Sequence, residues 1–233
     1  MSYLIYCIFR GPLPAALDIP DGVGGYRVFT SNYNGLGAAL SKLPELEPCF
    51  DGSNHLAYER VVESFYRHLT VVPLRYGCRV ECPYDAAVLL RDNERAYRAL
   101  LCELDGFAEV GIQVQLGGPT AGPQAARRRI LPGWFPLRWR PAAAPGLGPE
   151  LTAAAPNALI EKLCDSLQGS FVRHKVEFPP SRKSRHLSLH FLVPRDSVET
   201  FRSAARHLPP NPSFQLQLSG PWPPYSFVDV LQP

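Results

Sequence analysis

The chain carries a pair of cysteines and a pair of histidines whose spacing could hold a metal ion. Cys78 and Cys82 stand four residues apart in CRVEC, and His186 and His190 stand four residues apart in HLSLH. In an extended strand such positions share one face, so each pair could present its side chains together. Tetrahedral zinc sites usually combine CxxC with a second pair of ligands, and this spacing fits them poorly. We interpret the thiols as buried small side chains and the histidines as the polar side of a strand, and we expect no metal and no cofactor.

Sequence motifs of nucleophilic and phosphate-binding enzymes are absent. The chain contains no G-x-S-x-G, no P-loop, no G-x-G-x-x-G after a strand and no H-E-x-x-H. Acidic pairs such as Glu59 and Glu63 are neighbours on the surface of a helix, which makes them poor candidates for paired-carboxylate chemistry. The residues therefore give no reason to expect an enzyme.

Three basic segments, two of them with aromatic residues, suggest nucleic-acid binding as an alternative. They are ARRRI at 126–130, WFPLRWRP at 134–141 and RHKVEFPPSRKSRH at 173–186. Positive charge combined with aromatic stacking holds single strands in many proteins. The strand expected at 185–193 nevertheless lacks the aromatic signature of the common RNA-binding module. We keep an RNA-binding module as the alternative function, and we expect no nucleic-acid partner.

Length and composition indicate a globular protein of the cytoplasm. The 233 residues are 45% hydrophobic and 19% charged, with a net charge of only +3 and 25 prolines that cluster in loops. No apolar stretch reaches the roughly 18 residues that a membrane span needs. The N-terminal MSYLIYCIFRG lacks a basic region and a cleavage site, so it predicts a first strand and not a signal peptide.

The first half of the chain predicts an α+β domain over residues 1–106. The expected strands are 3–9, 26–31 and 70–77, and the expected helices are 35–43, 54–69 and 83–106. The strand at 70–77 carries a proline, so it should lie at an edge of the sheet or end there. The last helix should begin at Pro83 and could break near Asp92.

The second half predicts a second α+β domain over residues 107–233. The expected elements are a strand at 109–116, a helix at 153–169, strands at 171–178 and 185–193, a helix at 196–208 and a strand at 213–220. This β-α-β-β-α-β order is that of a modified ferredoxin-like fold. A Pro/Gly-rich insert at 117–150 interrupts it, and a C-terminal extension at 219–233 follows it. The fold class is therefore α+β, with two domains.

The C-terminal extension is unusually rich in rings and prolines for a chain end. In LSGPWPPYSFVDV the residues Trp222, Tyr225 and Phe227 alternate with prolines that favour a stiff, extended course. Burial of each ring would contribute about 1.5–3 kcal/mol. We predict a strap that lies across the first domain or the interdomain seam, and we keep a solvent-exposed PxxP ligand as the alternative.

Four segments resemble the family of gas vesicle proteins F and L, accessory proteins of gas vesicle assembly. The run LSGPWPPYSFV is similar to the family's L-x-G-P-W-P-P-Y-S-F ending, and LHFLVPRDSVETFRSAA is similar to the segment before it. VVPLRYG, which contains Arg75 and Tyr76, is similar to the family's V-x-P-x-R-F-G, and YLIYCI to its opening strand. The resemblance covers residues 3–9, 56–77, 107–116 and 185–228 in the family's order.

The resemblance implies a non-enzymatic assembly or structural protein at the gas vesicle. Members of the family have two α+β domains and are thought to bind the small hydrophobic rib protein of the vesicle shell and to help its assembly; other accessory proteins are possible partners. The family usually has charged helices where this chain has the Pro/Gly-rich segment 117–150. That departure puts any role of those helices in doubt.

A protein that holds an apolar rib protein should offer apolar surface or an open sheet edge. The edges of both sheets and the aromatic loop around Trp134 are candidates, although the loop's tryptophans could equally cover a sheet. The candidate structural and interface residues are Arg75, Tyr76, Trp134, Phe135, Trp139, Trp222, Tyr225 and Phe227.

Overall fold

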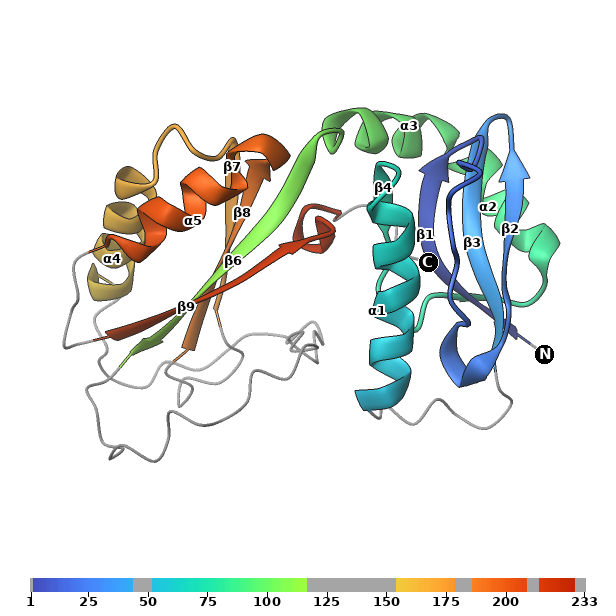
Figure 1. Ribbon diagram of the computed structural model, residues 1–233, viewed down its shortest axis with the longest axis horizontal. Helices are drawn as coiled ribbons and strands as arrows, with labels where there is room; N and C mark the ends of the chain where they lie inside the picture. Colours follow the sequence, from blue (N-terminus) through green and yellow to red (C-terminus); the bar gives the residue numbers. More distant parts are fainter. Residues whose placement is uncertain (1, 44–51, 117–153, 179–185, 209–213, 229–233) are drawn as a thin grey trace. The chain divides into compact units, whose positions relative to one another are not determined.

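The computed structural model describes residues 2–43, 52–116, 154–178, 186–208 and 214–228 (Figure 1). Among these, residues 2–109 and 222–228 form one compact unit and residues 110–221 form a second. Each unit is α+β, as the sequence predicts. The insert at 117–150 lies outside the described residues, and the division into domains 1–106 and 107–233 stays a prediction. No helix in the described part is long and apolar enough to cross a membrane.

A five-stranded antiparallel sheet forms the centre of the first unit. Its order is β2-β3-β1-β4, and β5 pairs with β1 beside β4. The strands are β1 (Ser2–Arg10), β2 (Val28–Tyr33), β3 (Leu36–Leu43), β4 (Val71–Pro73) and β5 (Arg79–Val80). Residues 4–9 are buried without interruption, because helices cover both faces of β1. Pro73 is the last residue of an edge strand, which confirms that prediction.

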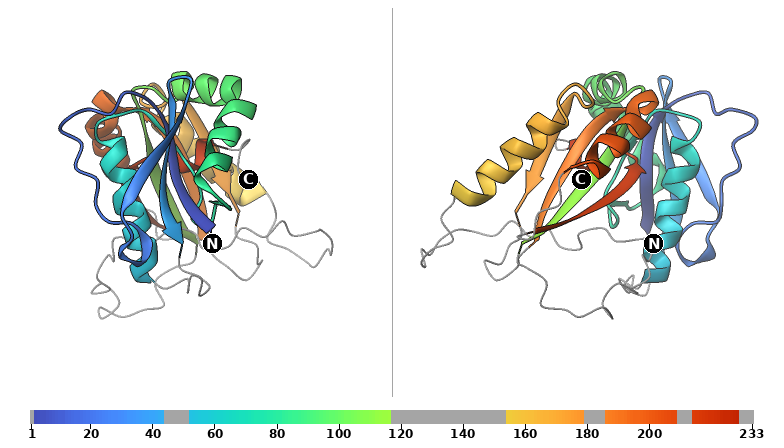
Figure 2. Two further views of the ribbon diagram at one scale, coloured as in Figure 1. Left: turned by 90° about the vertical axis from the view of Figure 1, so that its right-hand side faces the viewer. Right: turned by 60° about the vertical axis from the view of Figure 1, so that its left-hand side comes forward.

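Three helices pack against this sheet. They are α1 (Gly52–Tyr66), α2 (Pro83–Asp92) and α3 (Glu94–Glu103). Figure 2 shows α1 on one side of the sheet and α2 with α3 on the other. α2 begins at Pro83, and the backbone N–H of Cys82 donates to the Asp85 carboxylate at 2.9 Å to cap it. The expected break is confirmed at Asn93, which separates α2 from α3.

The short helix expected at 35–43 is wrong, because these residues form the strand β3. Asn34 and Gly35 both have positive φ angles, 45° and 76°, and they connect Tyr33 directly to its cross-strand partner Leu36. A two-residue turn of this kind, with Asn-Gly at its centre, is the strongest short-range signal of a β-hairpin. The alanines of β3 suggested a helix, but the turn before them decides the pairing.

Replacing Gly35 by alanine should destabilise the first unit by about 1–2 kcal/mol, because only glycine adopts the left-handed conformation without a steric cost. Chemical denaturation would measure this as a lower midpoint. Gly52→Ala is the matched control, since Gly52 starts a helix and a Cβ there meets nothing within 4 Å. Equal stability of the two variants would contradict the role assigned to the turn.

The second unit is built on a four-stranded antiparallel sheet in the order β7-β8-β6-β9 (Figure 1). Its elements, in chain order, are β6 (Phe107–Leu116), α4 (Ala154–Ser166), β7 (Arg173–Glu177), β8 (His186–Pro194), α5 (Val198–Arg206) and β9 (Phe214–Trp222). The first three residues of β6 and the last residue of β9 belong to the first unit. All six elements confirm the types that the sequence predicts.

One face of this second sheet is apolar and the other is polar. On β8, the side chains of Leu187, Leu189 and Phe191 are buried, and the Phe191 ring lies 5.1 Å from the ring of Phe201 on α5. Ser188 and His190 alternate with them on the opposite face. The helices therefore pack on the apolar face.

Candidate interaction surfaces

Three tyrosines in the first unit form an aromatic cluster between α1 and the sheet. The ring of Tyr58 on α1 stacks on Tyr6 of β1 at 4.9 Å and meets Tyr76 edge-on at 5.2 Å. Tyr76 also contacts His55 edge-on at 5.6 Å. Tyr6 and Tyr58 are fully buried, and Tyr76 is partly buried. These three residues are called the tyrosine cluster below.

The hydroxyl of Tyr58 connects α1 to β1 and to the residue that follows β4. The hydroxyl lies 3.1 Å and 3.0 Å from the carbonyl oxygens of Ile5 and Tyr6, and 2.8 Å from that of Leu74. Because a hydroxyl has one proton, these three acceptors share it. The Tyr6 hydroxyl accepts the backbone N–H of Val23 at 3.0 Å and lies 2.7 Å from Ser41 Oγ. The cluster therefore fixes α1 on β1.

The predicted site residues Arg75 and Tyr76 follow β4. The structure places the Tyr76 ring within the tyrosine cluster, edge-on to Tyr58, whereas the Arg75 side chain is exposed. The Arg75 carbonyl accepts the backbone N–H of Cys78 at 3.1 Å, which closes the turn into β5. Their place in binding stays a prediction, as does that of Trp134, Phe135 and Trp139, which lie outside the described residues.

The C-terminal segment, defined here as Trp222–Val228, belongs to the first unit. Phe227 and Val228 are 4% and 0% exposed, Tyr225 packs against the core that contains Tyr58, and Trp222 is half-buried. Phe227 ends a short 3-10 turn that begins at Tyr225. The rings of this segment therefore face the core to different degrees.

Glu109 holds the middle of the C-terminal segment. This carboxylate is only 5% exposed, and it accepts the backbone N–H of Ser226 on Oε2 and the Ser226 hydroxyl on Oε1, each at 2.8 Å. Hydrogen bonds to an ionised acceptor are roughly twice as strong as neutral ones. Sequence reasoning missed Glu109, because its partner lies 117 residues away along the chain.

In the described part of the chain, several cysteine and tyrosine side chains have a raised pKa because they are buried. The pKa of Tyr225 lies well above its usual range because of burial and then because of the nearby Glu59 carboxylate. Burial likewise raises the pKa of Tyr97 to about 12. The other groups whose pKa burial raises are Tyr6, Tyr58, Cys7, Cys78 and Cys164. An activated nucleophile needs the opposite shift, so burial does not activate any of these groups for nucleophilic attack.

Among the residues described, no group of three or more His, Cys, Asp and Glu side chains could hold a metal ion. Cys78 is buried beside the tyrosine cluster, and Cys82 caps α2. His190 lies 3.6 Å from the Glu177 carboxylate on the neighbouring strand. Cys78, Cys82 and His190 thus each have a contact within the fold, whereas His186 is exposed.

Exposed aromatic side chains lie at the β2 edge of the first unit. Phe29 on β2 is 37% exposed and contacts Tyr3 edge-on at 5.9 Å, and Tyr26, just before β2, is also 37% exposed. Tyr84 on α2 is 70% exposed, and α2 is tied to β2 where the Ser31 hydroxyl donates to the Pro83 carbonyl at 3.2 Å. Tyr26, Phe29 and Tyr84 are called the β2 edge surface. Periodicity alone does not single out these three residues; aromatic residues in and beside an uncharged edge strand are the signal that indicates them.

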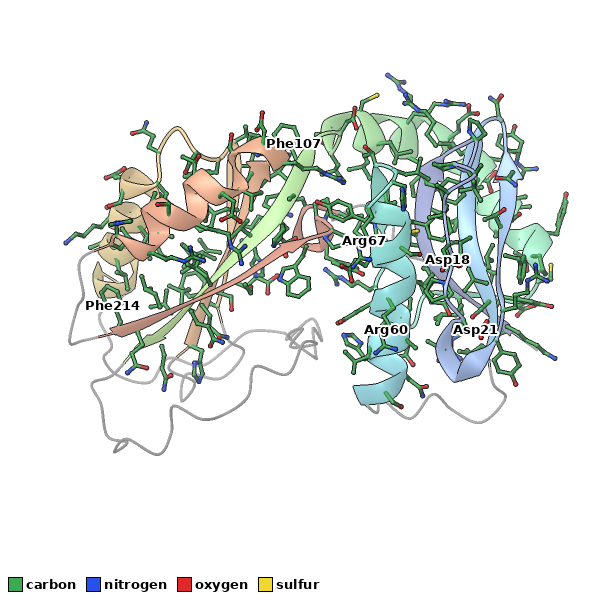
Figure 3. The ribbon with its side chains drawn as sticks, viewed as in Figure 1. Asp18, Asp21, Arg60, Arg67, Phe107 and Phe214 are labelled. Carbon is green, nitrogen blue, oxygen red and sulfur yellow. The ribbon has the colours of Figure 1, made fainter. Side chains whose placement is uncertain are left out.

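Charged side chains are exposed elsewhere on this unit, together with uncharged ones such as Leu13. Figure 3 labels Arg60 and Arg67 on α1 and Asp18 and Asp21 in the segment before β2. Arg67 pairs with Glu63 at 2.7 Å, one turn earlier on the helix. Such exposed pairs contribute little to stability. The apolar character of the β2 edge surface sets it apart from them.

Two α+β units, each built on an antiparallel sheet with helices packed against it, define a two-domain α+β protein. The sequence matches the model of one protein family over residues 2–127 and 150–229. The chain belongs to this family, gas vesicle synthesis protein GvpL/GvpF.

Relatives and solved structures agree with this membership. Gas vesicle protein F1 of Halobacterium salinarum is 22% identical over 218 residues, which are 92% of this chain and 87% of that protein. Gas vesicle protein F of Haloferax mediterranei is 23% identical, over 92% and 87% of the two chains. The crystal structures of GvpF from Microcystis aeruginosa and Anabaena sp. PCC7120 have TM-scores of 0.68 and 0.65 at 14% and 17% identity. They cover 98% of this chain, and 99% and 96% of their own, and so support the fold.

Proposed function

We propose that this protein is a non-enzymatic assembly protein that binds the small hydrophobic rib protein of the gas vesicle and assists its incorporation into the shell. The proposal rests on the match to the family model over residues 2–127 and 150–229. The protein would act in the cytoplasm and at the vesicle, with the rib protein and other gas vesicle accessory proteins as its partners.

The β2 edge surface supports this proposal and suggests where the rib protein binds. Aromatic side chains are enriched at the centres of protein interfaces, where they contribute most of the binding energy. Phe29 and Tyr84 expose such rings beside a strand that, among the described residues, pairs only with β3. An extended apolar segment could add to this edge and cover both rings.

The polar face of the second sheet does not favour the RNA-binding alternative. RNA-binding sheets of comparable topology stack bases on aromatic side chains of their central strands. Within the second unit, the two central strands present Gly111, Gln113, Ser188 and His190 on that face, and none of these is Phe, Tyr or Trp. Phe107 follows the same alternation at the start of β6 but belongs to the first unit. The strand order β7-β8-β6-β9 supports the ferredoxin-like description of the unit without implying a nucleic-acid partner.

Co-expression with a tagged rib protein would test the proposal. Wild type should co-purify with the rib protein, and Phe29→Ser/Tyr84→Ser should reduce the captured amount about tenfold, as expected when aromatic anchors are lost. Phe178→Ser is the matched control, because Phe178 is 61% exposed in the second unit; it should leave capture unchanged.

The same experiment separates the surface from the function. Failure of wild type to bind any rib protein would contradict the proposed function. Normal capture by Phe29→Ser/Tyr84→Ser would exclude only the β2 edge surface. Loss of capture in Trp134→Ala/Trp139→Ala alone would instead assign binding to the aromatic loop.

A further inference from the structure

The two edges of the second sheet differ in how they are protected from pairing with another strand. β7 at one edge carries the charged residues Arg173, Lys175 and Glu177. Charges on an edge strand hinder the addition of another strand, because pairing would bring them together or desolvate them. This edge therefore has the protection that soluble proteins commonly use.

β9 at the other edge lacks this protection. Its nine residues, FQLQLSGPW, contain no charge, and its first proline is Pro221, near the end. Within the described residues β9 pairs with β6 alone. Natural proteins shorten, twist or charge such an edge unless another strand occupies it. As far as the described residues show, Arg202 of α5 donates to the Gly220 carbonyl at 3.2 Å near the end of β9, and the stretch before Gly220 is open to strand addition on the side away from β6.

The side chains of β9 alternate in a way that fits an identical strand. Phe214, Leu216 and Leu218 are partly buried, whereas Gln215, Gln217 and Ser219 are exposed. In an antiparallel pair centred on Gln217, Leu216 lies opposite Leu218 of the second strand, and Gln215 lies opposite Ser219. Apolar residues then meet apolar residues on one face, and uncharged polar residues meet on the other.

We infer that two copies of this chain associate through β9, in an antiparallel and isologous pair that joins two four-stranded sheets into one of eight strands. A two-fold axis lets the same patch serve both partners. Pro221 ends the paired segment because it has no N–H to donate. The contact is short, so the dimer should be weak and dependent on concentration. The inference is independent of the proposed binding of the rib protein.

Charge-swap variants at the exposed positions of β9 test this inference by analytical ultracentrifugation. Wild type should shift from monomer to dimer as concentration rises. Gln215→Lys/Gln217→Lys and Gln215→Glu/Gln217→Glu should each dimerise about tenfold more weakly, because like charges face one another across the axis. An equimolar mixture should recover a heterodimer at least as stable as the wild-type dimer. Gln168→Lys, at an exposed position after α4, is the control and should dimerise like wild type.

Each other outcome overturns the inference. A wild type that is monomeric at all concentrations would show that β9 does not join two copies. A dimer insensitive to the β9 variants would place the interface elsewhere. If wild type is monomeric and the β9 variants no longer capture the rib protein, β9 pairs with a strand of another protein instead of a second copy. Thermal unfolding of each variant confirms that the fold is kept.

Discussion

Replacing Tyr58 by alanine should lower the free energy of unfolding of the first unit by about 3–5 kcal/mol, which is a large part of the stability of a typical domain. The side chain is 1% exposed, and its removal would leave a cavity between α1 and β1. It would also remove the hydroxyl that lies within hydrogen-bond distance of the carbonyls of Ile5, Tyr6 and Leu74. Chemical denaturation followed by circular dichroism would measure the loss.

Tyr58→Phe separates the hydroxyl from the ring. It should cost about 1–3 kcal/mol, because buried carbonyl oxygens lose a donor while the ring packing is kept. The Tyr6 carbonyl keeps a second donor, the backbone N–H of Leu74 at 3.0 Å. Tyr84→Ala is the control for a tyrosine outside the core and should change stability by less than about 0.5 kcal/mol. A Tyr58→Phe variant as stable as wild type would show that the ring alone holds α1 to the sheet.

Local patterns predicted most elements, because helix and strand periodicity are written in adjacent residues. They failed at β3, where both faces of the strand are covered and the apolar alternation disappears. Ala38 and Ala39 suggested a helix, but the small residue before them, Gly37, points to close packing of strands. A Cβ on Gly37 would lie 2.3 Å from Cζ of Phe9 on β1, so glycine is required for the strands to pack.

The candidate surfaces were harder to predict than the elements. The rings of Trp222, Tyr225 and Phe227 are conspicuous in the sequence, whereas Glu109 has nothing near it that indicates a partner. The exposure of the Phe29 side chain depends on which residues of α2 cover the sheet. The periodicity of the sequence does not predict how a helix is placed on a sheet. Residues whose role depends on distant partners therefore emerge only from the folded chain.

Loss of the Glu109 carboxylate should release the C-terminal segment while the rest of the first unit stays folded. In Glu109→Gln, the amide oxygen can still accept the Ser226 backbone N–H and the amide N–H₂ can donate to the Ser226 hydroxyl, so two hydrogen bonds to a carboxylate become neutral ones, at a cost of about 1–2 kcal/mol. Local opening needs less free energy than global unfolding, so the effect should concentrate in this segment. Hydrogen exchange should show faster exchange at the Ser226 and Phe227 amides and unchanged exchange in β1.

Two further variants are compared with Glu109→Gln: Phe227→Ala, which removes a buried ring of the segment, and Glu81→Gln, which is the control. Phe227→Ala should also speed exchange in the C-terminal segment and cost about 3–5 kcal/mol, because a ring that is 4% exposed leaves the core. Glu81→Gln, at an exposed position, should leave exchange unchanged. If Glu109→Gln exchanged like wild type while Phe227→Ala did not, the apolar contacts alone would hold the segment, and Glu109 would only orient Ser226. If both variants speed exchange, the ion and the ring act together, which explains how a chain end rich in proline stays on the first unit.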